Sequence, residues 1–460
     1  MKLKRAITSA LAVILLASCS ELPTSVSKRT VPEQLDLAMR LFPARTMPDG
    51  VSRSNADISE EFIDYAFSLE SGQNLTWLSR FEVPVGVALI NSASQVISRD
   101  LDHLIARLQN EAGVTIRRLD SPLAANIVIE MIPKRQLLRT APNAACIVVP
   151  RISSWAEFRQ SRFNRRSDWA SLRERKRVAI FIPMDVSAQD VRDCLHEELA
   201  QALGPLNDLY RVPDSVYNDD NFHIILTSYD MLMLRIFYAP ELRSGMTKRE
   251  VVAVLPDLLR RLNPEGVGLI PRQLKKAPKA WTRSIEAALG ARGNIEARYF
   301  AATKAIRVAE RVGINDHRLG FSYYARARVN AVRDPRKAAE DYKRAYANFL
   351  QAFGPHDIHT ARAALHLASL SLSEGELDQA LKYIEPSLVG AKNAQNGRLL
   401  LSLLAMKAEV YQHEGLVAKA KAIRQEAIGW GQYGVYKPTE ITARLKLIAG
   451  LIPKTPQTEG

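Results

Sequence analysis

Cysteine is scarce in this chain, and so are long apolar segments. Only 3 Cys occur among 460 residues, and no two of them stand in a Cys-x-x-Cys pair. The count excludes a small scaffold held by disulfides, and the spacing excludes a zinc ribbon or a thiol redox motif. The apolar run of twelve residues at positions 6–17 is too short to cross a bilayer as a helix. The composition also excludes a protein with several membrane spans.

Neither charge nor hydrophobicity departs far from the values of soluble proteins. Hydrophobic residues make up 47% and charged residues 24%, which excludes a disordered tail and a collagen-like fibre. The length predicts two domains with tails, at roughly 100–200 residues per domain. The formal net charge is +14, which is compatible with binding to nucleic acid, with approach to an anionic membrane, or simply with solubility.

The N-terminus has the pattern of a secretory signal. Basic residues within the first five positions precede the apolar run, which ends in Leu16-Ala17-Ser18-Cys19. This tetrad resembles the bacterial lipobox, and the resemblance implies that residues 1–18 are removed and that Cys19 carries the lipid. Several acyl chains anchor a protein stably, because each buried CH₂ contributes about 0.8 kcal/mol. The alternative is an ordinary cleaved signal with a chance cysteine.

The lipobox resemblance also predicts a compartment. Ser20 follows the cysteine, and in Gram-negative lipoproteins a serine there resembles outer-membrane sorting. We therefore expect a lipid-anchored protein on the periplasmic side of the outer membrane, with the inner membrane as the alternative. In that oxidising compartment Cys146 and Cys194 could pair, and closing a loop of this length gives about 4 kcal/mol of stabilisation. Two buried free thiols are the other possibility.

Strand-like and helix-like segments alternate through residues 56–250, which follow a proline-containing tether at residues 19–55. Strands are predicted at residues 81–90, 126–132, 146–149 and 178–182. Helices are predicted over residues 101–108 with an end at Gly113, after Ser187 with Asp190 three residues on, and from Thr227 and Asp230 onward. The pattern indicates an α+β domain.

A second, all-helical domain is predicted after a proline- and lysine-containing connector at residues 251–285. Over residues 286–436, small and large apolar residues recur with a period of 40, from Gly375 to Gly415. The pattern resembles tetratricopeptide repeats, in which small residues let paired helices approach, although the usual period is shorter. An unrelated array of helical hairpins is the alternative. Residues 437–460 are predicted to be a fading helix and a polar tail. Arrays of this type expose a concave surface that commonly holds a protein segment.

One segment could carry chemistry: residues 194–208, which resemble the zinc-binding helix of zincin metallopeptidases. The zincin motif HExxH places two imidazoles one turn apart and a glutamate beside the bound water. A register that begins at His196 puts Ala200 at the second ligand position. A register fixed on Gly204 gives Glu197, Glu198, Gln201, Gly204 and Asn207, so no ligand position keeps an imidazole. Only the general-base position keeps its glutamate, which is Glu198.

Two further segments are consistent with zincin ancestry. Asp214-Ser215-Val216-Tyr217 stands where metzincins have their Met-turn, with Tyr217 in place of methionine. The segment from Thr227 to Tyr238 resembles their closing helix. The resemblance therefore implies a zincin-like fold with a degenerate site.

Residues 54–246 also resemble a proteobacterial lipoprotein family that is defined by domain of unknown function 2927. The resemblance rests on Leu69-Glu70-Ser71-Gly72, Ser79-Arg80-Phe81-Glu82, Cys194 with residues 197–201, Gly204 with Asn207-Asp208, and residues 242–246. It implies no established activity, substrate or site.

The remnant motif leaves a cluster of side chains with oxygen atoms: Glu197, Glu198, Gln201, Asn207 and Asp208, with Asp219 or Asp220 as further candidates. Oxygen ligands suit Ca²⁺ or Mg²⁺ better than zinc. The alternative, which we prefer, is a hydrogen-bonded polar network that holds the old cleft together. We expect His196 to be a packing or capping residue rather than a ligand. We therefore predict no cofactor and no resident metal.

A basic stretch at residues 151–177 contains interleaved tryptophan and phenylalanine residues. Aromatic side chains over a basic groove are typical of nucleic-acid binding, but a periplasmic address favours anionic lipid or an acidic protein, and a solvated loop is the simplest interpretation. Taken together, these patterns predict an adaptor without catalysis: a zincin-like domain next to a helical array that binds another envelope protein, with no nucleic-acid partner. The alternatives are a metal-dependent hydrolase with oxygen ligands and Glu198 as base, and a module that binds anionic lipid or another polyanion.

Overall fold

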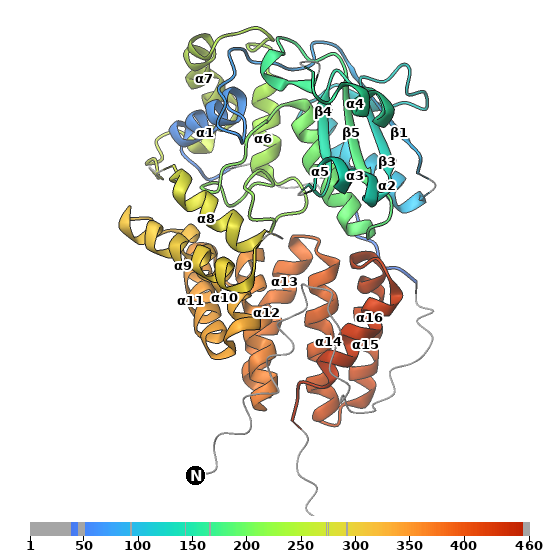
Figure 1. Ribbon diagram of the computed structural model, residues 1–460, viewed down its shortest axis with the longest axis vertical. Coiled ribbons are helices and arrows are strands. Elements are labelled where there is room, and N and C mark those ends of the chain that lie inside the picture. The colour runs from blue at the N-terminus through green and yellow to red at the C-terminus, as the bar shows by residue number, and fades with distance from the viewer. Residues whose placement is uncertain are drawn as a thin grey trace, which may run out of the picture. The chain divides into compact units, whose positions relative to one another are not determined.

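The computed structural model describes residues 38–44, 51–92, 94–142, 144–164, 167–272, 274, 276–290 and 293–453 (Figure 1). The chain divides into two compact units. One comprises residues 43–275, and the other comprises residues 276–460 together with residues 1–42. Within the described residues, no helix has both the length and the apolar character needed to cross a membrane. The predicted signal and Cys19 lie outside the described residues.

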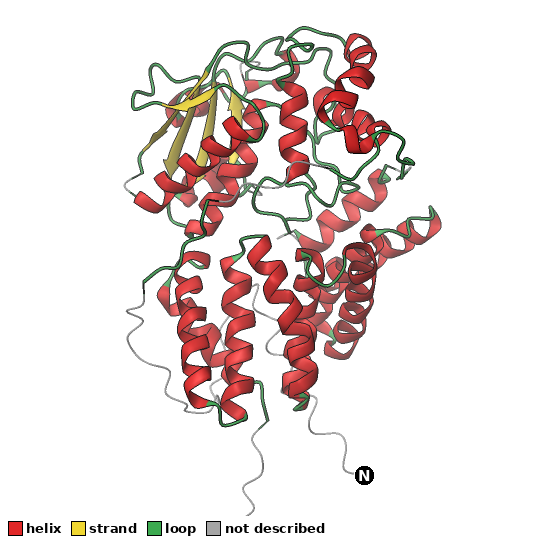
Figure 2. Ribbon diagram, turned by 180° about the vertical axis from the view of Figure 1, so that it is seen from behind, coloured by secondary structure: helices red, strands yellow, loops and turns green. Residues whose placement is uncertain are grey.

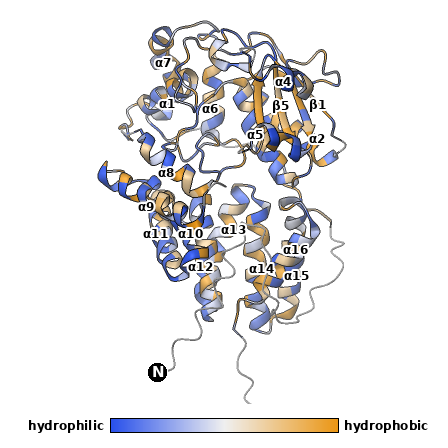
Figure 3. Ribbon diagram, viewed as in Figure 1, coloured by the Kyte–Doolittle hydropathy of each residue, from blue (hydrophilic) through white to orange (hydrophobic). Residues whose placement is uncertain are grey.

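The first unit is an α/β domain built on a five-stranded mixed sheet. Its strands are β1 (Val85–Ile90), β2 (Ile116–Arg118), β3 (Ile127–Ile132), β4 (Ile147–Pro150) and β5 (Val178–Pro183). They lie in the order β2-β1-β3-β5-β4, and only the edge strand β4 runs antiparallel to its neighbour. The central strands are buried on both faces, which is why they read as continuous runs of valine and isoleucine and appear as a hydrophobic block in Figure 3.

Helices α2 (Gln95–Asn110) and α5 (Ala188–Leu203) pack on one face of this sheet, and α3 (Lys134–Thr140) and α4 (Trp155–Ser161) pack on the other. Helices α1 (Asn55–Phe67), α6 (Ser228–Phe237) and α7 (Lys248–Leu262) pack with one another beside the sheet. Alternate residues of β5 serve different cores: Val178, Ile180 and Ile182 face the large core, and Ala179 and Phe181 face a smaller one beside α3 and α4. Figure 2 shows the sheet between its helices.

Helix starts in this unit follow the predicted capping residues. The Ser187 side chain accepts a hydrogen bond from the Asp190 backbone N–H and begins α5. Thr227 and Asp230 form a reciprocal capping box at the start of α6. The predicted strands correspond to β1, β3, β4 and β5, and the short strand β2 was not predicted.

The connector predicted for residues 251–285 is shorter in the structure. Residues up to Leu262 belong to α7, which buries Leu255, Leu258 and Leu259 in the large core and keeps Pro256 within the helix. The helix continues because its apolar stripe, at spacings of three and four residues, has a surface to pack against. Helical structure resumes at α8 (Lys279–Leu289).

The second unit is entirely helical over its described residues. After α8 it contains α9 (Ile295–Arg311), α10 (His317–Arg333), α11 (Pro335–Phe353), α12 (Ile358–Glu374), α13 (Leu377–Asn393), α14 (Gly397–His413), α15 (Val417–Gly434) and α16 (Pro438–Ala449). Each helix from α8 to α15 packs chiefly on its hairpin partner, and α12, α14 and α16 pack successively in one layer. Figure 1 shows the hairpins side by side.

Small residues bring the paired helices close, as the repeat pattern predicts. A side-chain carbon at Gly434 would lie 2.5 Å from the backbone nitrogen of Arg398, and one at Gly390 would lie 2.9 Å from the His356 carbonyl oxygen. Gly375 and Gly415 both have positive φ angles, 79° and 78°, at the ends of equivalent helices. The 40-residue period is therefore a repeat of the same turn.

Two segments predicted as tail and tether contain more ordered structure than expected. The tail predicted after residue 437 forms α16, which buries Ile441, Leu445 and Ile448. Part of the predicted tether is also ordered: Phe42 stacks on Trp430 with a 4.4 Å separation of ring centroids. The Arg40 backbone N–H donates to the Gly429 carbonyl over 2.9 Å. The segment at residues 38–42 is therefore packed against α15.

Candidate functional site

Helix α5 carries most of residues 194–208, the segment that resembles the zincin motif. It follows the fully buried strand β5, and Val191, Leu195 and Leu199 anchor one of its faces in the large core. Cys194 on this helix forms a disulfide with Cys146, which immediately precedes β4, and the two sulfur atoms lie 2.09 Å apart. The bond ties the motif helix to the edge of the sheet.

The end of α5 is held by an arginine from the basic stretch. Arg175 is 2% exposed and donates to the carbonyl oxygens of Gln201, Ala202 and Gly204 at 2.6, 2.8 and 2.6 Å. A cation suits a helix C-terminus because its carbonyls lack internal partners. Burial lowers the pKa of Arg175 to about 10. Arg175 therefore has a structural role and does not belong to a surface patch.

Gly204 is required at the end of α5 by packing. A side-chain carbon there would lie 2.8 Å from the Phe237 ring on α6. The resemblance to zincins implies that this glycine ends the helix, and the close approach of α6 is a second reason for a glycine here.

The His196 side chain is buried and hydrogen-bonded within the fold instead of serving as a metal ligand. It is 2% exposed, and its Nδ1 atom accepts a hydrogen bond from the Leu226 backbone N–H over 3.1 Å. Burial lowers the pKa of His196 well below its usual value, and Arg192 and Arg107 lower it further. The imidazole is therefore neutral and joins α5 to the segment before α6, which agrees with the predicted packing role.

Glu197 and Glu198 lie near one another on α5 in surroundings that disfavour their charged forms. Burial and then the Glu70 carboxylate raise the pKa of Glu198 to about 8. Burial also raises the pKa of Glu197 well above its usual value, followed by repulsion from Glu198 and other acids. Perturbed carboxyl groups of this kind occur at functional sites and in structural networks alike.

The loop after α5 carries the next two members of the predicted cluster. The Asn207 Nδ2 group donates to the Asp64 carbonyl over 3.2 Å, and its Oδ1 atom accepts from the Asp208 backbone N–H over 3.1 Å. Asn207 is therefore used to fix the loop against α1. Asp208 has a buried Oδ1 atom without a hydrogen-bond partner. Burial and then Asp219 raise the pKa of the Asp208 carboxyl.

Two residues that the sequence did not assign to this cluster, Glu70 and Tyr217, also lie at it. Glu70, in the turn after α1, acts electrostatically on Glu197, Glu198 and Asp208. It lies within Leu69-Glu70-Ser71-Gly72, one of the runs that carry the family resemblance, so a signal was present. Tyr217 is completely buried, and its hydroxyl has no partner. We call Glu70, Glu197, Glu198, Asp208 and Asp219 the carboxylate cluster.

The members of the carboxylate cluster are electrostatic neighbours, but their oxygen atoms do not converge on one point. Among the described residues of the α/β unit, no three His, Cys, Asp or Glu side chains bring their ligand atoms within 4.8 Å of one another. Of the predicted members, Glu197, Glu198 and Asp208 share electrostatic neighbours. Asn207 is instead held by the backbone of α1.

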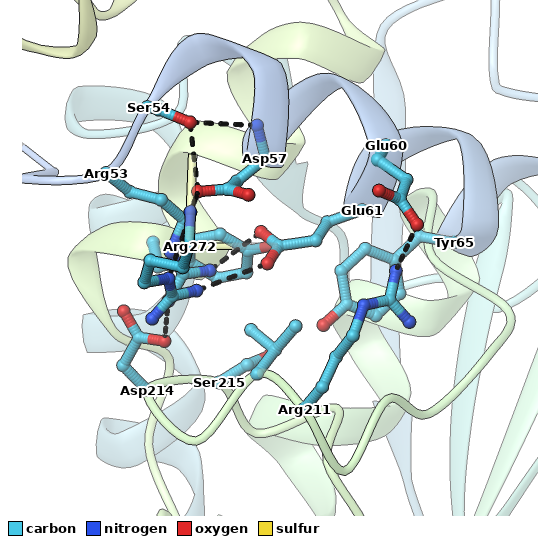
Figure 4. Close-up of polar contacts among 12 residues, drawn as sticks. Arg53, Ser54, Asp57, Glu60, Glu61, Tyr65, Arg211, Asp214, Ser215 and Arg272 are labelled. Atoms are coloured by element: carbon cyan, nitrogen blue, oxygen red, sulfur yellow. Dashed lines mark hydrogen bonds and ion pairs between the residues drawn. The ribbon is translucent and has the colours of Figure 1, made fainter. Parts of the chain in front are cut away.

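A second charged cluster lies across the start of α1, and the sequence interpretation missed it (Figure 4). The Arg53 guanidinium donates to Glu61 over 2.7 Å and also pairs with Asp214. It lies over the Tyr229 ring at 4.3 Å, and the Tyr229 hydroxyl donates to Glu61 over 2.8 Å. Arg272 contacts Glu61 over 3.3 Å. We call these residues the Arg53 network.

The Arg53 network shows how this domain accommodates buried acids. Burial lowers the pKa of Arg53, but Asp214 and Glu61 outweigh burial and raise the pKa overall. The Arg211 guanidinium likewise donates a hydrogen bond to the buried Asp64 carboxylate over 2.6 Å. Both arginines fix the loop before α6 onto α1, so the network is structural.

The aromatic residues of the basic stretch are divided between core and surface. Trp155 is buried and lies 5.0 Å from Phe181, and Phe158 stacks on the same ring at 5.7 Å. Phe163 is 89% exposed, with Arg162 over its ring at 4.5 Å. Most of the interleaved aromatic pattern therefore comes from packing and not from a stacking platform for bases.

Comparison with protein families identifies the first unit. Residues 55–257 match the family model described as Protein of unknown function (DUF2927). The chain contains a DUF2927 domain. The match covers the α/β unit from α1 into α7 and agrees with the resemblance seen in the sequence. No curated protein and no solved structure matches the chain.

Proposed function

We propose that the protein is a lipid-anchored adaptor of the cell envelope. In this proposal the DUF2927 domain is a zincin-like domain without catalytic activity, and the helical unit is a tetratricopeptide-like array that holds another envelope protein. The lipid on Cys19 tethers the chain to the outer membrane on its periplasmic side.

The loss of the imidazole ligands is the observation that carries the proposal. The only histidine in the motif, His196, accepts a backbone N–H and lies buried. Asn207, at the third ligand position, is held by the Asp64 carbonyl. Zinc sites need nitrogen or sulfur ligands that converge on one point, and these side chains serve the fold instead.

The helical unit supports a binding role. Its hairpins repeat with the same glycine-ended turn, at Gly375 and Gly415, and successive helices pack in two layers. Arrays of this kind offer extended surfaces on which a protein segment can lie. Such a surface could be formed by the first helices of the hairpins or by the second helices, and the two possibilities can be tested separately.

Site-specific photocrosslinking in the native host tests this proposal. A photoreactive residue would replace exposed Arg328 on α10, in the first-helix layer, or exposed Lys382 on α13, in the second-helix layer. We expect one discrete partner to be captured from one layer only. Equal capture of many proteins from both layers, or no capture, would contradict the adaptor.

Cys19 provides the control for the anchor. In cell fractionation, Cys19→Ser should move the protein from the membrane fraction to the soluble fraction. The purified, detergent-free variant should still crosslink to the same partner. If Cys19→Ser stays in the outer-membrane fraction, the proposed lipid anchor is wrong, whatever the crosslinking shows.

One observation favours a second function, a metal-dependent hydrolase with oxygen ligands. Glu198 is 6% exposed, and the pKa of its carboxyl is raised to about 8, within the range suited to a general base. Hydrolysis of peptides or esters by the purified chain that is lost in Glu198→Gln would support this function. The adaptor predicts no such activity in either protein.

A further inference from the structure

Four separate segments of the DUF2927 domain converge at the carboxylate cluster. The Leu206 backbone N–H donates to the Tyr65 carbonyl over 3.1 Å, which brings the loop after α5 against the end of α1. The Leu209 N–H donates to the Tyr217 carbonyl over 2.9 Å. Since Glu70 follows α1 and Asp219 follows Tyr217, these backbone contacts bring their segments to Asp208.

The electrostatic neighbours in this cluster differ from those in the Arg53 network. Glu61 lies 2.7 Å from Arg53 (Figure 4), and Asp64 lies 2.6 Å from Arg211. In contrast, the groups that act on the Glu197 carboxyl are Glu198, Asp193, Glu70 and Asp219, all of them acids. Burial raises the pKa of the Asp208 carboxyl, and Glu70 raises it further by repulsion and by a side-chain hydrogen bond. Two carboxyl groups that interact in this way need a proton or a cation between them.

Two buried polar atoms without hydrogen-bond partners lie at the carboxylate cluster. The Asp208 Oδ1 atom is buried and has no hydrogen-bond partner. The Tyr217 hydroxyl is also buried without a partner, in a side chain that is 0% exposed. It lies within electrostatic range of both Glu197 and Asp208. A buried polar atom that lacks a protein partner normally binds a water or an ion.

We propose that the carboxylate cluster binds one Ca²⁺ ion. Hard cations take oxygen ligands, carboxylates among them, and this cluster supplies carboxylates, whereas the imidazole of His196 is engaged elsewhere. Calcium suits the site better than magnesium, because ligands on four segments give irregular geometry and Mg²⁺ demands a near-ideal octahedron. This inference is independent of the adaptor proposal.

Binding requires the exposed members to close over the buried ones. Glu70 and Asp219 are exposed and lie in turns, whereas Glu198 is buried on α5. The ion would draw these turns toward α5, since no three ligand atoms yet lie within 4.8 Å. Calcium would thereby join the turn after α1, α5 and the loop before α6, whereas the Arg53 network joins α1 to that loop and to α6.

Calorimetry and thermal unfolding of the full chain, stripped with EDTA, test the site. We expect one Ca²⁺ per chain, a higher melting temperature with CaCl₂, and weaker binding of Mg²⁺ and Zn²⁺. Glu197→Gln and Asp208→Asn should each weaken Ca²⁺ binding by about tenfold or more, because the affinity follows the ligand charge. Glu265→Gln, an exposed glutamate outside the cluster, is the matched control and should bind as the unaltered chain does.

The same variants separate lost ligands from lost folding. In EDTA, Glu197→Gln and Asp208→Asn should melt at or above the temperature of the unaltered chain, since each removes repulsion between acids. Absence of Ca²⁺ binding by the folded chain, tighter binding of Zn²⁺ or Mg²⁺, or equal loss in Glu265→Gln would each overturn the proposal. The adaptor is judged separately by its crosslinks, so either proposal can fail alone.

Discussion

Replacing Arg53 by methionine is expected to destabilise the DUF2927 domain strongly. The side chains of Arg53 and Glu61 are only 3% and 5% exposed, and their atoms lie 2.7 Å apart. Methionine keeps most of the length of the arginine stem but leaves the Glu61 carboxylate to Arg272 and to the Tyr229 hydroxyl. Breaking a buried ion pair by removing one partner costs about 3–5 kcal/mol.

Urea unfolding measures this loss, and an exposed ion pair supplies the control. With a denaturant slope of about 2–3 kcal/mol per molar urea, Arg53→Met should lower the midpoint by roughly 1–2.5 M. Arg260 pairs with Asp257, with 65% and 79% of the two side chains exposed. Arg260→Met should therefore cost at most about 1 kcal/mol.

The pH dependence of the Arg53→Met loss tests the cause. Burial raises the pKa of Glu61 above its usual value even with Arg53 present, and removal of Arg53 raises it further. When folding raises the pKa of an acid, the acid contributes to the free energy of unfolding at pH values below its pKa in the unfolded chain. That contribution is lost as the pH rises through its pKa in the folded chain. The penalty of Arg53→Met should therefore be larger at pH 7 than at pH 4. Equal penalties at both pH values, or a loss no larger than that of Arg260→Met, would refute the reasoning.

Three further outcomes follow from other parts of the chain. Cys146→Ser with Cys194→Ser should lower the free energy of unfolding by about 4 kcal/mol, measured against the oxidised parent, because the bond closes a separation of 48 residues. Gly434→Ala should cost about 1–3 kcal/mol by calorimetry, because the added carbon meets helix backbone at 2.5 Å. Burial and then two arginines lower the pKa of His366 to about 3. A depressed imidazole pKa lowers the free energy of unfolding as the pH falls, so His366 should contribute a loss of about 2 kcal/mol between pH 7 and pH 5. Over that range, His366→Phe, which keeps the stack on Tyr342, should lose about 2 kcal/mol less than the unaltered chain does.

The elements that local chemistry specifies could be predicted from the sequence. Ser187 and Thr227 begin helices because their hydroxyls accept backbone N–H groups three residues on, and these contacts require no knowledge of the fold. Strands β3 and β5 could be located because buried strands read as continuous apolar runs. Gly375 and Gly415 marked the repeat because only glycine adopts positive φ readily.

The remainder depended on contacts between residues far apart in the chain. Arg53 meets Asp214 across 161 positions, and Arg175 reaches the end of α5 from a stretch whose composition resembles a surface patch. Glu70 joins the carboxylate cluster only because backbone hydrogen bonds bring the loop after α5 to the end of α1. Charge in the sequence does not distinguish an arginine that is buried to neutralise an acid from one that is solvated.

The adaptor proposed above would hold a partner without cleaving it. Native mass spectrometry of the purified chain, mixed with the partner identified by crosslinking, measures binding and cleavage together. We expect a stoichiometric complex in which the partner keeps its full mass, both with the unaltered protein and with Glu198→Gln. Partner fragments that appear with the unaltered chain and vanish with Glu198→Gln would contradict it.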